Sequence, residues 1–324
     1  KEIIKKKKDF VLLTNAPRPN HVVKSFLEKL GMEKEIIEHV FTSGEAALLY
    51  LKQNLSDKTF FHVGPPRDFD LFKDFKKMKF CLNTSTIKPQ PLIKKIELAG
   101  QSGYDGIELW INDIYEYIGR GGEVRDIEQA LSDNGLIVPS MIAIRQWGDM
   151  DGWEYELVKD EAKRRFSLCA RLGSPYIVAT PPLEKTDTEK LPERYSDLLK
   201  IGRTEGVKPT FEYISFFKSV YCLADAWEIV KKTDDPDSSI ILDAFHNWNS
   251  NSTLDDLRKV PLEKISHYHI DDAALGKPAT TQKDPDRVMI GEGQIDLKAE
   301  IEVLKGLGYD KTVSLDLFNC ELWN

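Results

Sequence analysis

The chain has 324 residues, of which 41% are hydrophobic and 30% charged, and its net charge is −8. This composition allows a sizeable buried core, and the acidic balance speaks against a general binder of nucleic acid or of an anionic membrane. No signal peptide and no apolar run near about 18 residues is found. The four cysteines form no C-x-x-C pair, so we expect reduced thiols and a cytoplasmic protein.

Residues 1–78 have the pattern of a short, partial α/β segment of the Rossmann-like kind. Four elements are predicted there, in the order strand 9–15, helix 19–31, helix 43–55 and strand 59–64. The first helix has a proline at its start and a glycine as its stop, and the breaker "PPRD" closes the second strand.

From Lys79 onward, strand-like runs that end in polar residues alternate with helical stretches such as 91–103 and 153–173. Eight strands are predicted, at residues 79–84, 106–110, 137–143, 176–180, 208–214, 239–245, 265–270 and 312–318. Eight strand–helix units in about 246 residues are typical of a (β/α)8 TIM barrel. We therefore predict a barrel over residues 79–324. We expect it to lack its last helix, because the chain stops at Asn324, and we expect a chain clipped at both ends.

Chemistry in such barrels gathers at the C-terminal ends of the strands. The last four predicted strands end in polar residues, which are Glu212, Asp243, His269 and Asp316. Three carboxylates so close would raise one another's pKa unless a cation neutralised them. Mixed oxygen and nitrogen ligands suit a divalent metal, and the sequence does not choose among Mn, Mg, Co and Zn. Taken singly, each carboxylate could also be a helix cap or salt-bridge partner, and the histidine a core residue.

Five motifs follow one another along residues 79–324, namely "FEYI", "LDAFH", "HIDD", "IGEGQID" and "SLDLF". In these motifs and their order the segment resembles the xylose isomerase-like TIM barrels, the sugar isomerase and epimerase family that also holds inosose isomerases and dehydratases. The resemblance implies four metal ligands, which are Glu212, Asp243, His269 and Asp316. It implies that His246 contacts the substrate or the ligands, and that Arg287 binds a substrate hydroxyl or phosphate. Asp316 departs from the family, which has Glu at that position.

The resemblance further implies a metal-dependent isomerase or epimerase that moves a proton beside a carbonyl through an enediolate. Glu212 and Asp316 would share the proton transfer. Return of the proton to the neighbouring carbon gives isomerisation, return to the other face gives epimerisation, and loss of a β-hydroxyl gives dehydration. Trp110 and Trp248, near strand ends, could pack on a sugar ring or serve in the core. The expected partner is a small sugar or cyclitol rather than nucleic acid or membrane, and a homo-oligomer is left open.

Residues 9–70 resemble part of a NagD-like haloacid dehalogenase-type phosphatase, on the motifs "LLTNAPRPN", "TSGEAA" and "VGPPRD". Those phosphatases need a D-x-D nucleophile motif, and none precedes Thr14. We therefore expect a remnant without phosphatase activity.

Three further alternatives concern the barrel. An AP endonuclease of the same fold would need extra histidines at the second and third strand ends and after the seventh strand, where this chain reads "IELW", "MIAIR" and "AALGKPATTQ". An inosose-type dehydratase or a catalytically impaired remnant stays open, and the second of these is favoured by Asp316 and by the missing last helix.

Overall fold

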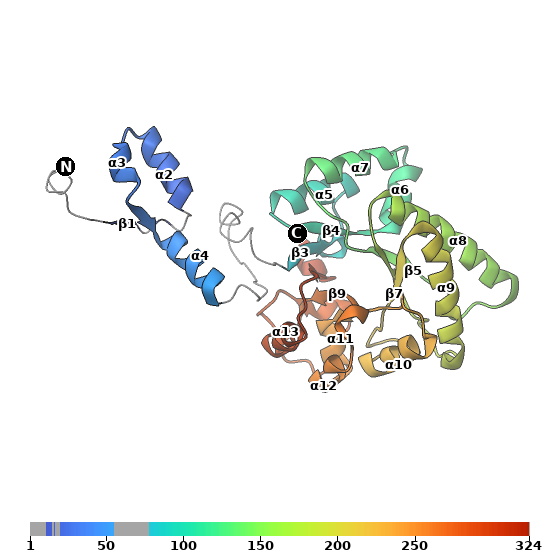
Figure 1. Cartoon of the computed structure of the whole chain (residues 1–324). Coiled ribbons are helices and arrows are strands. Elements are labelled where there is room, and N and C mark those ends of the chain that lie inside the picture. Colours follow the sequence, from blue (N-terminus) through green and yellow to red (C-terminus); the bar gives the residue numbers. More distant parts are fainter. Residues whose placement is uncertain (1–10, 15, 17–19, 55–77, 324) are drawn as a thin grey trace. The chain divides into compact units, whose positions relative to one another are not determined.

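The computed structural model describes residues 11–14, 16, 20–54 and 78–323 (Figure 1). The chain divides into two compact units, Lys1–Met78 and Lys79–Asn324. None of the helices in the described ranges is long and apolar enough to cross a membrane.

The first unit is a small α/β arrangement built on two parallel strands, β1 and β2. Its elements are β1 Leu12–Thr14, α2 Asn20–Lys29, α3 Lys34–Ile37, β2 Val40–Thr42 and α4 Ser43–Asn54. The side chain of Asn20 accepts a hydrogen bond from the Thr42 amide at 2.9 Å, which ties the start of α2 to the end of β2. One predicted strand and both predicted helices are confirmed over the described residues. Strand β2 was not predicted because three residues are too few to show an alternating pattern, and the predicted strand 59–64 lies outside the described residues.

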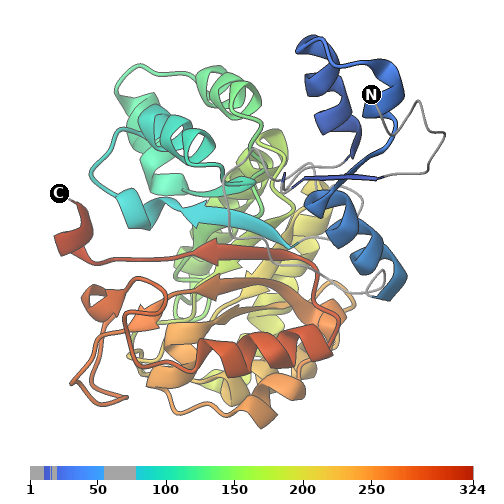
Figure 2. The ribbon, with the colours of Figure 1, turned by 90° about the vertical axis from the view of Figure 1, so that its left-hand side faces the viewer.

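The second unit is a closed barrel of eight parallel strands in chain order, with the last strand paired to the first. The strands are β3 Lys79–Asn83, β4 Gly106–Trp110, β5 Met141–Ile144, β6 Tyr176–Ala179, β7 Lys208–Phe211, β8 Ile240–Asp243, β9 Ile265–Ile270 and β12 Thr312–Leu315. Figure 2 shows the first of them, in cyan, beside the last, in red. This confirms the predicted (β/α)8 barrel, and all eight predicted strands are present.

Helices surround the barrel strands (Figure 1). They are α5 Leu92–Gln101, α6 Ile111–Gly119, α7 Val124–Asp133, α8 Gly152–Arg171, α9 Leu191–Glu205, α10 Leu223–Thr233, α11 Ala244–Asn249, α12 Leu254–Arg258 and α13 Leu297–Gly306. Side-chain caps set several of their starts: Asp243 caps α11, Thr253 caps α12 and Asp296 caps α13.

The region after β9 departs from the simple strand–helix alternation. A short antiparallel pair joins β10 Asp272–Ala273 to β11 Arg287–Val288, which returns the chain to the barrel rim. After β12, the last described element is the short 310 helix η6 Cys320–Trp323. Strand β12 is nevertheless held on both edges, by β9 and by β3.

Candidate active site at the C-terminal ends of the strands

Three of the predicted ligands meet where β8, β9 and β12 end. The ligand atoms of Asp243, His269 and Asp316 all lie within 4.8 Å of one another, and all three residues are buried. The ring atom Nδ1 of His269 lies 3.4 Å from Asp316 Oδ2 and 3.7 Å from Asp243 Oδ2. The strand register produces this meeting, since Asp243 pairs directly with His269 across β8 and β9.

Glu212, the fourth predicted ligand, follows β7 and stays outside this close group. Its carboxylate accepts a hydrogen bond from Thr180 Oγ1 at 3.0 Å. Removal from water raises the pKa of Glu212 to about 7, although the nearby charge of His269 opposes the rise. Because the charges of His269 and Asp243 both affect the pKa of Glu212, this half-buried carboxyl lies within electrostatic reach of the cluster.

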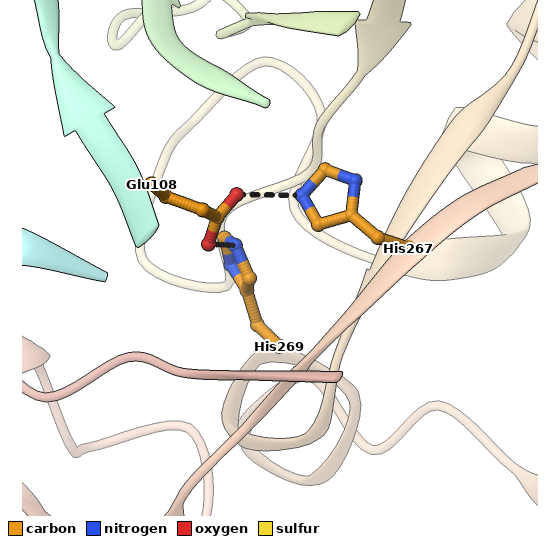
Figure 3. A group of neighbouring side chains, drawn as sticks. All are labelled: Glu108, His267 and His269. Carbon is orange, nitrogen blue, oxygen red and sulfur yellow. Dashed lines mark hydrogen bonds and ion pairs between the residues drawn. The ribbon is translucent and has the colours of Figure 1, made fainter. Parts of the chain in front are cut away.

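A buried carboxylate that was not predicted orients His269 from behind (Figure 3). Glu108, on β4, binds Nε2 of His269 at 2.8 Å and Nε2 of His267 at 2.9 Å. Burial acts against ionisation of Glu108, but the two imidazoles lower its pKa well below the usual range. Because a carboxylate only accepts hydrogen bonds, Nε2 of each ring carries a proton. We therefore interpret Glu108, His267 and His269 as a hydrogen-bonded network rather than as a second ion site.

The geometry of His269 provides a test of whether a cation fits the cluster. Its Nδ1 is buried and has no hydrogen-bond partner in the described part of the chain, and both facing carboxylate oxygens are too far for a direct hydrogen bond. Burial acts to lower the pKa of His269, yet Glu108 and Asp316 raise it well above the usual value. The pocket around Nδ1 therefore attracts positive charge, and one imidazole with two carboxylates fits a divalent metal ion.

Arg287 already supplies part of the positive charge that the sequence analysis attributed to a metal alone. Its buried guanidinium donates to Asp243 Oδ2 at 3.1 Å and also to Asp271. Each of its three nitrogens has a protein partner, because Nε and Nη2 contact Asp284 and Nη2 also contacts His246. Arg287 thus borders the cluster, and its positive charge partly neutralises Asp243 and Asp316.

His246 lies behind Arg287 and is neutral near pH 7. Burial lowers its pKa to about 4. Its Nε2 lies 3.0 Å from Arg287 Nη2, and its Nδ1 lies 3.1 Å from Ser215 Oγ and 3.4 Å from the Ser215 amide nitrogen. Its backbone amide donates to Asp243 Oδ1 at 2.7 Å. The histidine therefore holds both Asp243 and Arg287 in place.

The two tryptophans differ in position. Trp110 ends β4, donates from Nε1 to Asn83 Oδ1 at 3.0 Å and packs edge-on against Phe318, which follows Asp316 by two residues. Trp248 is partly buried in α11, and nothing found in the described residues joins its side chain to the cluster. Trp110 is thus the better placed of the two to contact a substrate.

The "IGEGQID" motif forms a loop that is held by another residue missed in the sequence. Asp272 Oδ2 accepts from the amides of Gly291 and Gly293, each at 3.1 Å. A Cβ on Gly293 would approach the Ala273 carbonyl and the Asp272 carboxylate to 2.3 Å. The motif therefore fixes backbone next to the site.

The sequence held signals for two of the residues that were not predicted. The segment "HYH" places His267 and His269 on one face of a strand, and Asp272 directly follows "HID".

Comparison with known proteins agrees with this architecture. Residues 96–322 match the family described as xylose isomerase-like TIM barrel, and the chain belongs to this family. This confirms the resemblance found in the sequence. A second, weaker match, to haloacid dehalogenase-like hydrolase, covers residues 1–80.

Among individual relatives, the inosose isomerase of Halalkalibacterium halodurans is 29% identical over 255 residues, which are 76% of this chain and 90% of the relative. The 3-dehydroshikimate dehydratase of Pseudomonas putida is 24% identical over 235 residues, 70% of this chain but 36% of the relative. A solved structure described as IOLI protein with a binding zinc atom aligns with a TM-score of 0.72 at 27% identity, covering 76% of this chain and 91% of that one.

Proposed function

We propose that residues 79–324 form a divalent-metal-dependent isomerase that acts on an inosose or a related cyclic keto sugar. The observation that carries the proposal is the buried group of Asp243, His269 and Asp316. In it Nδ1 of His269 faces two carboxylates and has no hydrogen-bond partner among the described residues. The likeness to inosose isomerases, which spans most of their length, supports this class of substrate.

Asp243, His269 and Asp316 would hold the metal, and Glu212, whose pKa the charges of His269 and Asp243 affect, would join them as a fourth ligand or face the substrate. The zinc reported in the solved relative supports a divalent ion without deciding which one this chain uses. When bound, the ion would act as a Lewis acid that polarises the substrate carbonyl.

The residues of the chain supply the proton transfer. Glu212 lies on the β7 side of the cluster and Asp316 on the β12 side, so the two carboxylates can flank a substrate bound between them. Glu212 would remove the proton beside the carbonyl and release it to solvent at the end of the cycle, and Asp316, which Ser85 fixes through a 2.7 Å hydrogen bond, would take up a proton from solvent and return it to the substrate from the other side. The guanidinium of Arg287 and the backbone amide of His246 both donate to the Asp243 carboxylate, which keeps it ionised and fixes its position. The same residues also permit epimerisation.

A second candidate is dehydration of a cyclic keto acid. It is supported by the likeness to 3-dehydroshikimate dehydratases, and it would use the same initial proton removal followed by loss of a hydroxyl.

The test combines metal analysis with solvent exchange. The full chain is purified, its metal content is measured, and deuterium uptake beside the carbonyl is followed for scyllo-inosose and for 3-dehydroshikimate. Asp243→Asn should lose both metal and exchange, whereas Asp255→Asn, which changes an exposed acid on α12, should lose neither. Full metal content and exchange in Asp243→Asn would refute the proposal.

A further inference from the structure

A cavity of about 740 Å³ lies at the end of β5, between that strand end and α8. Its wall includes Trp110, Ile142 and Ala143, which pack with Val178 and Ile241 in one buried cluster. Ile241 lies on β8, two residues before Asp243, and Trp110 touches Phe318 near Asp316. The cavity therefore adjoins the proposed site, and its volume falls within the range of about 300–1,000 Å³ usual for small-molecule sites.

Three arginines line this cavity, and only one of them lacks a carboxylate partner within residues 78–323. Arg164 is paired with Asp160 and Glu161, and Arg165 with Glu161. Arg145 is exposed, and its guanidinium lies 5.9 Å from the centre of the Trp110 ring and forms no ion pair in the part of the chain that the structure describes. Its positive charge is therefore available to a ligand.

The position of Arg145 is set by irregular backbone at the end of β5. The pairing of β5 with β6 shifts by one residue between Ile142 and Ile144, and Gln146 has a positive φ of 64°. Such a bulge re-aims the side chain that follows it, and bulges are common beside active sites. Arg165 holds the bulge by donating to the Ala143 carbonyl.

Arg145 is also within electrostatic reach of the proposed proton-transfer residue. Burial raises the pKa of Glu212, and Arg145 is among the charges that oppose this rise. A ligand that spans the distance between Arg145 and Glu212 would place one end in the cavity and the other at the cluster.

We propose that Arg145 binds an anionic group, a carboxylate or a phosphate monoester, carried by the substrate away from its reacting carbonyl. The proposal rests on the proposed function for the position of that carbonyl. A guanidinium recognises either anion through paired hydrogen bonds, whereas a neutral cyclitol would leave Arg145 without a partner. Within the class given under the proposed function, this favours cyclic keto sugars that carry a carboxylate or a phosphate over neutral inososes, with a flat face of the ring packed on Trp110.

The test measures equilibrium binding by the full, metal-loaded chain. The probes are matched pairs that differ in the anion, namely glucuronate with glucose and fructose 6-phosphate with fructose, together with 3-dehydroshikimate. Arg145→Ala should raise the dissociation constant of the anionic probes by about 10- to 100-fold and leave the neutral probes unchanged. Arg145→Lys should restore part of the loss. Arg164→Ala, which removes a paired arginine from the same cavity, is the matched control and should change nothing.

The experiment compares dissociation constants and needs no turnover, so it tests anion binding at Arg145 even if neither proposed reaction is observed. Loss confined to glucuronate and 3-dehydroshikimate would assign a carboxylate site, and loss confined to fructose 6-phosphate a phosphate site. Equal binding of charged and neutral probes by the parent chain, or an Arg145→Ala variant that binds the anions as the parent does, would overturn the proposal.

Discussion

Glu108 and His269 are joined across the interior of the barrel by a 2.8 Å contact between the carboxylate and Nε2 of the ring. The contact lies on the side of the imidazole opposite to Asp243 and Asp316, which face Nδ1. One side of the ring is therefore fixed by a buried acid while the other is presented to the cluster. Carboxylates that orient a histidine in this way raise its basicity as a ligand.

Replacement of this acid should weaken metal binding without removing a ligand. In Glu108→Gln an amide replaces the carboxylate, so the orientation and charge that hold His269 are lost, and zinc affinity should fall by about 10- to 100-fold. Competition with a chelating dye measures the affinity, and nitrogen-15 shifts of His269 report whether Nε2 still carries the proton. Glu116→Gln, an exposed change on α6, is the control. Unchanged affinity with an altered proton position would show that orientation of His269 is unimportant.

Asp316 stands where the resemblance leads us to expect Glu, and the structure shows that the aspartate side chain reaches the cluster. Its Oδ1 accepts from Ser85 at 2.7 Å and its Oδ2 lies 3.4 Å from His269. Asp316→Glu adds a methylene to a buried, hydrogen-bonded position, so the free energy of unfolding should fall by about 1–3 kcal/mol and metal affinity should drop. Thermal unfolding and metal titration measure both. A variant that is as stable as the parent and faster in solvent exchange would instead show that glutamate is the better residue here.

The barrel could be predicted from the sequence because each strand carries a local signal, a short apolar run that ends in polar residues before a helix. The same rule placed Asp243, His269 and Asp316 at neighbouring strand ends, and the structure brings their side chains together. Local signals do not say which residues meet across the barrel. Glu108 on β4 reaches His269 on β9, and these strands are not neighbours in the wall, so only the closed barrel reveals the pair.

The position of Arg287 was beyond sequence reasoning for a related reason. Its guanidinium is placed by the pairing of β10 with β11, two strands of two residues each, in which Ala273 faces Arg287. A strand that short has no periodic pattern. The resemblance implied that Arg287 binds substrate, and this role stays a prediction. The structure adds that each of its three guanidinium nitrogens contacts a protein group.

The glycine-rich loop offers a test of how the backbone supports the site. In Gly293→Ala the new Cβ would lie 2.3 Å from the Ala273 carbonyl oxygen, so the loop must move and Asp272 must lose its amide contacts. We expect a lower melting temperature and weaker metal binding, since the loop adjoins β10 and Arg287. Gly306→Ala is the matched control, because its Cβ would meet open space near the end of α13. Equal melting temperatures for the two variants would contradict the tight approach at Gly293.

A buried carboxyl outside the cluster should make stability depend on pH. Burial raises the pKa of Glu300 from 4.5 to about 7, although hydrogen bonds from Tyr268 and Asn247 oppose the rise. The folded state therefore holds this proton more tightly than the unfolded chain does. The resulting stabilisation is fully present below the unfolded pKa and is lost as the pH rises through about 7.

The expected loss is roughly 3 kcal/mol between about pH 5 and pH 8, since each pKa unit corresponds to about 1.4 kcal/mol. Glu300→Gln, which cannot ionise, should remove this part of the pH dependence, so that its stability relative to the parent improves as the pH rises. Urea unfolding across that pH range measures the difference. Glu302→Gln, an exposed change on the same helix, should follow the parent curve. If the free energy of unfolding changed with pH in the same way for the parent and Glu300→Gln, Glu300 would have the same pKa in the folded and unfolded states. The hydrogen bonds from Tyr268 and Asn247 would then offset the cost of burying its carboxylate.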